Sequence, residues 1–279
     1  MHKTVQDIIK MKNEKKKISA ITSYDYTLAS LCDKAGIDIL LVGDSAGMVM
    51  LGYENTIPVT MDQMCMFTEA VSRARKDSLL VSDLPFMSYQ ASIEDAINNS
   101  GRLVKAGADA VKLEGGTIMA ETISAIVDIG IPVMGHIGLQ PQTTMLSEGY
   151  KVQGKTKDTA MKLIEDAKEL EDAGVFSIAL EMVSHEVAQI ISETVSIPVI
   201  GIGSGVNCDG QVLVVQDLLG MYDKIKPKFA KRYMNLSEDI VKSLEKYRND
   251  VESGEFPTKE NSFSMNEEEL EKLREQLGS

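Results

Sequence analysis

Five short apolar segments of this chain each end on a side chain that can do acid–base or metal chemistry. The terminal residues are Asp44, Asp83, Glu114, His136 and Glu181. Continuous apolar runs of this length predict strands that are buried on both faces. In a parallel barrel such strand ends meet at one rim, which is where catalytic residues lie. The sequence therefore predicts an acidic site at the mouth of a barrel, suited to a divalent cation.

Three of these residues, Asp44, Asp83 and Glu114, follow the second, third and fourth predicted strands. Taken singly, an Asp after a strand often caps the next helix. Three carboxylates on one rim, however, repel each other unless a cation neutralises them. Oxygen ligands without sulfur favour Mg²⁺ over Zn²⁺. We therefore predict that the three residues bind Mg²⁺ or a similar divalent cation.

Lys112 precedes Glu114 by two residues, so both side chains should point into the barrel. A lysine in that position needs an anionic partner. Two interpretations remain open: an ion pair with one of the carboxylates, or a clamp for a substrate carboxylate or a developing oxyanion.

His136 and Glu181 end the fifth and sixth predicted strands. His136 suits three roles: a core residue, a metal ligand or an acid–base group. Glu181 suits either a helix cap or, across a pocket from a metal, a general base.

The elements that position these residues alternate between strand and helix. A short helix is predicted over residues 5–15, and the eight predicted strands cover residues 19–23, 39–44, 79–83, 110–114, 132–136, 177–181, 198–202 and 212–215. Gly36, Gly107 and Gly174 stand where a helix needs a left-handed residue to end. The pattern predicts an α/β fold, a (β/α)8 TIM barrel. An open doubly wound sheet is disfavoured, because no glycine-rich dinucleotide loop follows the first strand.

We expect one barrel domain over residues 1–279, with residues 227–279 forming a C-terminal helical extension. That extension contains a charged segment with a sparse apolar stripe, near residues 266–277.

Bulk properties exclude several classes of protein. The formal net charge is -13 and the pI is about 4.8, which argues against non-specific binding to nucleic acid or to an anionic membrane. The three cysteines have no ligand-like spacing, so neither a disulfide framework nor a zinc site is expected. The chain starts without an apolar signal core and has no stretch long enough to span a bilayer, which predicts a cytoplasmic protein.

Several longer segments closely resemble the ketopantoate hydroxymethyltransferase family. They include Val42-Gly-Asp-Ser45, Asp83-Leu-Pro-Phe-Met-Ser-Tyr89, Val111-Lys-Leu-Glu-Gly-Gly116, Gly135-His-Ile-Gly-Leu-Gln-Pro-Gln142 and Cys208-Asp-Gly-Gln-Val-Leu-Val214. The likeness runs in order from Thr22 to Phe229. Two departures, Gln216 where relatives have His and Ser204 where Ala is common, carry no matched catalytic role.

The resemblance implies a Mg²⁺-dependent barrel enzyme of pantothenate synthesis. Such an enzyme would transfer a hydroxymethyl group from 5,10-methylenetetrahydrofolate to 3-methyl-2-oxobutanoate through a Mg²⁺-stabilised enolate, giving 2-dehydropantoate. It would be a homo-oligomer, typically a decamer. In this sequence Glu181 would accept the proton, and the metal ligands would be Asp44, Asp83 and Glu114. The residues that would line the keto-acid site are Asp44, Ser45, Asp83, Lys112 and His136.

One rival activity uses the same fold and similar metal carboxylates, namely a carbon–carbon lyase of the phosphoenolpyruvate/isocitrate lyase type. Those lyases carry a cysteine on a loop after a middle strand. Residues 115–124 of this chain contain no cysteine, which counts against that activity.

Overall fold

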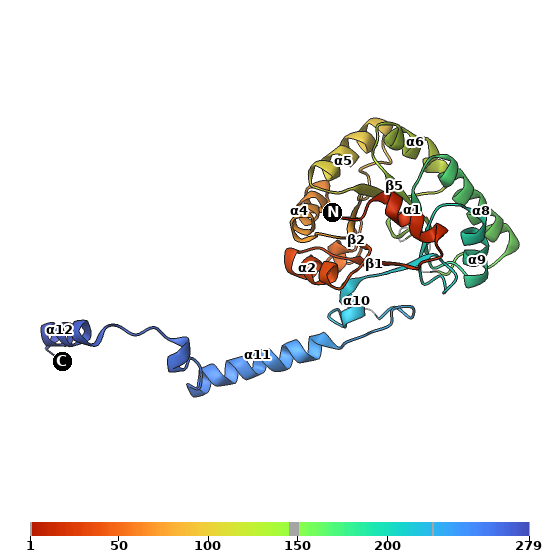
Figure 1. Cartoon of the computed structure of the whole chain (residues 1–279). Coiled ribbons are helices and arrows are strands. Elements are labelled where there is room, and N and C mark those ends of the chain that lie inside the picture. Colours follow the sequence, from red (N-terminus) through yellow and green to blue (C-terminus); the bar gives the residue numbers. More distant parts are fainter. Residues whose placement is uncertain (1, 145–150, 225, 279) are drawn as a thin grey trace.

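Eight parallel strands close into a barrel in which each strand pairs with its neighbours in sequence and β8 pairs with β1 (Figure 1). The computed structural model describes residues 2–144, 151–224 and 226–278. The strands are β1 (Ile18–Thr22), β2 (Ile39–Val42), β3 (Leu79–Asp83), β4 (Ala110–Glu114), β5 (Val133–Gly138), β6 (Ser177–Glu181), β7 (Val199–Ile202) and β8 (Gly210–Leu213). The predicted TIM barrel is confirmed.

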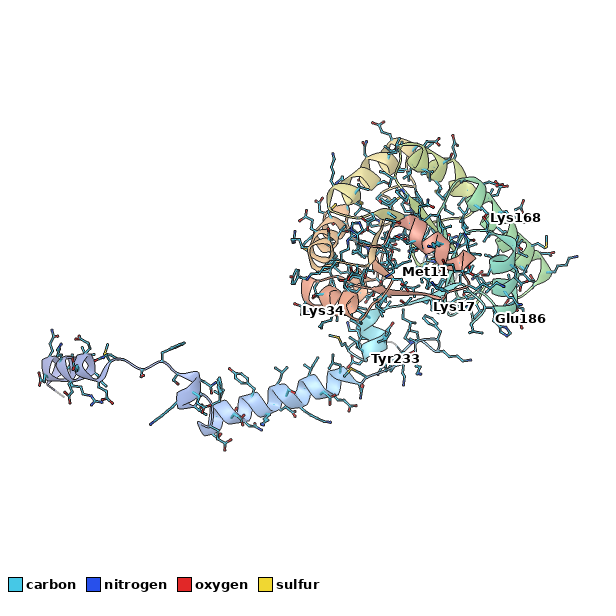
Figure 2. All side chains as sticks on the ribbon, viewed as in Figure 1. Met11, Lys17, Lys34, Lys168, Glu186 and Tyr233 are labelled. Atoms are coloured by element: carbon cyan, nitrogen blue, oxygen red, sulfur yellow. The ribbon has the colours of Figure 1, made fainter. Side chains whose placement is uncertain are left out.

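Helices cover the outside of the barrel. They are α2 (Tyr26–Lys34), α4 (Met61–Ala74), α5 (Ile93–Lys105), α6 (Ala120–Asp128), α8 (Lys157–Asp172) and α9 (His185–Thr194). Three short helices, α3 (Ala46–Val49), α7 (Pro141–Thr144) and α10 (Val215–Leu219), lie at the C-terminal rim of the barrel. Figure 2 shows Lys34, Lys168 and Glu186 on this outer layer with their side chains directed away from the barrel. Residues 203–209, which join β7 to β8, contain no helix.

Two apolar cores hold the layers together. One lies between the strands and the outer helices, where residues such as Leu40, Leu80 and Leu113 are fully or almost fully buried. The other fills the barrel interior and includes Ile8 from α1 (Val5–Asn13). Because Ile8 joins the interior residues, α1 closes the N-terminal end of the barrel. The opposite end stays accessible for a site.

Local sequence signals account for most element boundaries. Gly36, Gly107 and Gly174 have φ angles of 81°, 107° and 91°, as expected for residues that end helices. The prediction for the last strand was wrong by two residues: β8 begins at Gly210, and Val215 already begins α10. The backbone N–H of Val215 donates to Thr22 Oγ1 of β1, 3.1 Å away. This contact turns the chain out of the sheet. The valines of residues 212–215 favour a strand, so the sequence pattern did not reveal the turn.

The C-terminal segment extends away from the barrel (Figure 1). It carries α11 (Leu236–Ser253) and α12 (Glu267–Leu277), and neither of these described helices contains a buried residue. The predicted boundary at residue 227 falls between α10 and α11. Across the described parts of the chain, every helix is too short or too polar to cross a bilayer.

Candidate active site

Strand register brings the predicted site residues together at the C-terminal rim. Asp83 lies opposite Lys112 in the β3–β4 pair, and Glu114 lies opposite His136 in the β4–β5 pair. Glu181 ends β6 opposite Gly138 of β5. A side chain at Gly138 would lie 2.2 Å from the backbone oxygen of Glu181, so only glycine permits this close approach.

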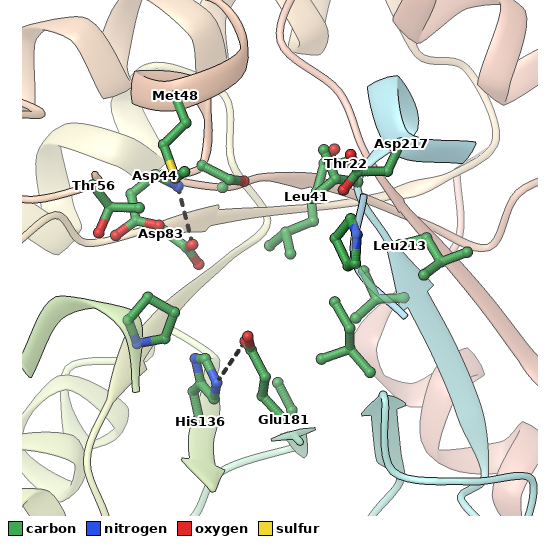
Figure 3. A pocket seen from close by; sticks show the side chains of 18 of the residues that line it. Thr22, Leu41, Asp44, Met48, Thr56, Asp83, His136, Glu181, Leu213 and Asp217 are labelled. Carbon is green, nitrogen blue, oxygen red and sulfur yellow. Dashed lines mark hydrogen bonds and ion pairs between the residues drawn. The ribbon is translucent and has the colours of Figure 1, made fainter. Parts of the chain in front are cut away.

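A cavity of about 390 Å³ opens at this rim (Figure 3). Its lining includes every residue predicted for the site, namely Asp44, Ser45, Asp83, Lys112, Glu114, His136 and Glu181. The sequence prediction of one shared pocket is therefore confirmed. The roles of the individual residues remain proposals.

Asp83 and Lys112 form a buried ion pair with a distance of 2.8 Å between Lys112 Nζ and Asp83 Oδ1. The other Asp83 oxygen accepts from the backbone N–H of Asp44 at 3.2 Å. Burial opposes the charge on Lys112, but Asp83 and the other carboxylates outweigh it and raise the pKa of this lysine. Lys112 is therefore a permanent cation in the pocket. The ion-pair interpretation is confirmed, and the clamp stays a prediction.

Asp44 and Glu114 are buried as well, but among the described residues neither forms an ion pair with a lysine or an arginine. Burial, followed by repulsion from Asp83, raises the pKa of Asp44 to about 7. Burial and then the charge on Asp44 raise the pKa of Glu114 well above its usual value. Asp44 does not cap the helix that follows it: Ser45 is the N-cap residue of α3, and α3 has no side-chain cap bond. If all three carboxyl groups were ionised, the site would hold more negative charge than Lys112 alone can balance.

Two of the three predicted metal ligands, Asp44 and Asp83, have the oxygen donors that Mg²⁺ prefers. Within residues 2–144, 151–224 and 226–278, no three His, Cys, Asp or Glu side chains are placed so that they could hold a metal ion together, so the structure does not show the predicted trio as a ligand set. Mg²⁺ does not need three such ligands, because it commonly uses one or two carboxylates and takes its other oxygens from water and substrate. Asp44 and Asp83, which adjoin each other, supply such a pair. Glu114 would complete the predicted trio.

His136 lies between two carboxylates on the floor of the cavity. Its Nε2 is 3.4 Å from Glu181 Oε2 (Figure 3), and its Nδ1 is 3.8 Å from Glu114 Oε1. Neither nitrogen has a hydrogen-bond partner among the described residues. Burial, and then the charge on Lys112, lower the pKa of His136, so the imidazole is neutral at pH 7. Glu181 does not cap α9, whose N-cap residue is Ser184.

The sequence analysis missed a polar network that supports the carboxylates. Gln142, which is 1% exposed, donates from Nε2 to Asp44 Oδ2 at 2.9 Å and from its backbone N–H to Glu114 Oε2 at 3.0 Å. Tyr89 donates its hydroxyl to Gln142 Oε1 at 2.9 Å. Both residues stand in segments that carry the family resemblance. Nothing local in those segments indicates which residues face the pocket.

Ser45 has a comparable support. Its hydroxyl lies 2.8 Å from that of Tyr24, a residue 1% exposed. Since Tyr24 is locked in the core, it restricts where the Ser45 hydroxyl can point.

Replacing Lys112 by methionine tests both interpretations of that residue. Breaking a buried pair leaves an uncompensated charge, so we expect Lys112→Met to lower the free energy of unfolding of the metal-free protein by about 3–5 kcal/mol. If the lysine also clamps a substrate carboxylate, calorimetry will show that affinity for 3-methyl-2-oxobutanoate, the keto acid that the family resemblance implies, is lost as well.

Lys12→Met is the matched control. Lys12 forms a part-buried pair with Asp209 at 2.9 Å, at the opposite end of the barrel. The Lys12→Met substitution should destabilise the protein and leave its affinity for the keto acid unchanged. A Lys112→Met protein that loses stability but retains full affinity would leave only the structural role.

Comparisons with known proteins agree on one family. Residues 2–259 match the profile described as ketopantoate hydroxymethyltransferase. The chain is 87% identical over all of its 279 residues to the 3-methyl-2-oxobutanoate hydroxymethyltransferase of Nitrosopumilus maritimus, and covers 100% of that protein. It is 58% identical to the protein of the same name from Cenarchaeum symbiosum, covering 92% of this chain and 97% of the relative.

Among solved structures, a 2,3-dimethylmalate lyase of the phosphoenolpyruvate mutase/isocitrate lyase superfamily superposes with a TM-score of 0.59. The superposition covers 100% of this chain and 98% of the lyase chain. The sequence identity is 14%, so the likeness shows the barrel fold alone. The rival lyase activity thus shares the fold, whereas the sequence matches lie with the transferases. The chain belongs to the ketopantoate hydroxymethyltransferase family and is an enzyme that transfers a one-carbon unit.

Proposed function

We propose that this protein transfers a hydroxymethyl group from 5,10-methylenetetrahydrofolate to 3-methyl-2-oxobutanoate, forming 2-dehydropantoate for pantothenate biosynthesis. One observation supports it most: Glu181 shares a single cavity with the Asp44–Asp83 pair and with Lys112. That arrangement places a carboxylate base, an oxygen-rich cation site and a fixed positive charge around one small substrate.

The keto acid would be bound by an ammonium group, a hydroxyl group and a bound metal ion. Lys112 Nζ can donate to the substrate carboxylate while it remains paired with Asp83, because an ammonium group has three donors. The Ser45 hydroxyl, oriented by Tyr24, can donate to a second substrate oxygen. Bound Mg²⁺, held by Asp44 and Asp83 with Glu114 as the third predicted ligand, would act as a Lewis acid that makes the C3 proton of the keto acid more acidic.

Glu181 is the group in position to remove the C3 proton. Its side chain is 15% exposed in the cavity, and the neutral imidazole of His136 lies 3.4 Å away. A neutral imidazole can direct an N–H toward the carboxylate without taking its charge away, so Glu181 remains a base. The enolate carbon would then attack the methylene carbon of the donor as one of its two C–N bonds breaks. Water would displace the remaining nitrogen, which gives the hydroxymethyl group and releases tetrahydrofolate. Holding both substrates in one cavity avoids most of the entropic cost of their encounter.

The same proposal includes a homo-oligomer, a decamer by resemblance, located in the cytoplasm. Helix α11 supports self-association because it carries large apolar side chains that are exposed. They are Ile240, Val241, Leu244, Tyr247 and Val251, each between 39% and 61% exposed. Exposed apolar stripes of this kind are typical of surfaces that another chain covers.

A direct assay tests the proposed function. We expect the purified protein to convert 3-methyl-2-oxobutanoate into 2-dehydropantoate when Mg²⁺ and 5,10-methylenetetrahydrofolate are present, and to stop when EDTA removes the metal. Mass spectrometry of the product follows the added carbon if the donor methylene is labelled with ¹³C. Cleavage of a carbon–carbon bond in place of addition would support the lyase alternative.

A further inference from the structure

The cavity is larger than the keto acid needs. Its volume of about 390 Å³ falls within the range of sites that hold drug-sized ligands, whereas the proposed keto acid has only five carbons. The side chains predicted to bind the keto acid occupy one wall. The opposite wall is formed by β8, α10 and the segment after α10, and we call it the second lobe. Its residues include Leu213, Asp217, Tyr222, Pro227 and Phe229.

Besides the exposed Lys228, Asp217 is the charged residue in this mostly apolar wall. It belongs to α10 and is 9% exposed, and Figure 3 shows it across the cavity from Asp44 and Asp83. Within the described chain, its carboxylate makes no hydrogen bond and no ion pair. Arg232 is the nearby cation, but its guanidinium donates to the Tyr222 carbonyl at 3.0 Å. Burial raises the pKa of Asp217, and Arg232 offsets this effect only in part.

A carboxylate that is largely buried is costly unless it accepts hydrogen bonds from the protein, from water or from a ligand, and the described residues supply Asp217 with none. The carboxylate is planar and, when ionised, can only accept hydrogen bonds. Its best complement is a flat group that offers two parallel N–H donors, as a guanidinium does. The apolar surfaces of Leu213, Pro227 and Phe229 beside it suit an uncharged ring system in preference to a free guanidinium.

We propose that the second lobe binds the 2-amino-4-oxopterin ring of the one-carbon donor and that Asp217 recognises the ring through its N3–H and 2-amino groups. In the pterin these two donors are adjacent and coplanar, and the ring is apolar on both faces. The inference rests on the proposed function, because it assigns the co-substrate of that reaction to a part of the same cavity. It also explains why the unpaired carboxylate lies on the wall opposite the cation site.

The test uses the full chain with saturating Mg²⁺ and 3-methyl-2-oxobutanoate. Calorimetry compares 6-methylpterin with 6-methyl-2,4-dioxopteridine, in which a carbonyl oxygen replaces the amino donor. We expect the wild type to bind the pterin ~10- to 100-fold more tightly, the range expected for hydrogen bonds to a charged group. Asp217→Asn should remove this preference. It should also raise the KM for 5,10-methylenetetrahydrofolate by a similar factor.

Two controls separate recognition from folding. The exposed residue Asp223 lies on the same segment, and Asp223→Asn should behave as the wild type does. Exchange of the C3 hydrogen of the keto acid in D₂O needs no donor, so Asp217→Asn should retain it if the variant is folded.

Each failure has its own signature. Equal pterin preference in the wild type and in Asp217→Asn, or a loss of keto-acid affinity in place of pterin affinity, would overturn this inference and leave the proposed function standing. A wild type that binds the pterin selectively but transfers no hydroxymethyl group would overturn the proposed function instead.

Discussion

Replacing Glu181 by glutamine should reduce exchange of the C3 hydrogen of 3-methyl-2-oxobutanoate by roughly 10²–10⁴-fold, the usual contribution of a general base. The wild type, given Mg²⁺ and the keto acid in D₂O without donor, should exchange this hydrogen. Enolisation needs only the cation and the base, so the donor is dispensable for this step. Loss of the C3 proton signal in NMR spectra measures the rate directly.

The substitution is close to isosteric, which makes its interpretation direct. A glutamine retains the shape of Glu181 and can still lie 3.4 Å from His136 Nε2, but it cannot accept a proton at neutral pH. Metal and keto-acid affinities should therefore change little. Glu186 on α9 is exposed, and Glu186→Gln serves as the matched control because it removes the same charge outside the pocket. Undiminished exchange in Glu181→Gln would move the base elsewhere, with His136 as the next candidate.

Replacing Asp44 by asparagine should separate the cation site from the fold. We expect Mg²⁺ affinity, measured by calorimetry with the keto acid present, to fall by about 100-fold or more. Residues that only support a metal ligand already contribute 10–100-fold. At pH 8 the metal-free variant should be at least as stable as the wild type, because the change removes a buried charge that Asp83 repels. The amide oxygen can still accept the bond from Gln142.

Asp83 would be a poorer test of the same site. It is the partner of Lys112 at 2.8 Å, so its loss would strand a buried ammonium group and destabilise the protein. Asp128→Asn, on the exposed surface of α6, controls for the change in net charge. Wild-type Mg²⁺ affinity in Asp44→Asn would remove Asp44 from the metal ligands.

The amino-acid sequence by itself determined the barrel and the location of its site. The apolar runs before Asp83, Glu114 and Glu181 are short and end at polar residues, as strands buried on both faces do, and parallel strands require helices between them. Helix-ending glycines such as Gly107 mark the period of the repeat. Once the strands are parallel and the barrel is closed, their C-terminal residues must converge, so local patterns predicted the shared pocket without any knowledge of packing.

The tertiary structure alone decided how the polar groups of that pocket are paired. Sequence could not tell which carboxylate would face Lys112, because the β3–β4 register that selects Asp83 is set by side chains packed from distant parts of the chain. Gln142 and Asp217 lie on segments that follow strands, and no periodic pattern there reveals which side chains face inward. Short-range signals determine strands and helices, whereas the partners of a buried charge depend on contacts between residues far apart in sequence, which exist only after the barrel has closed.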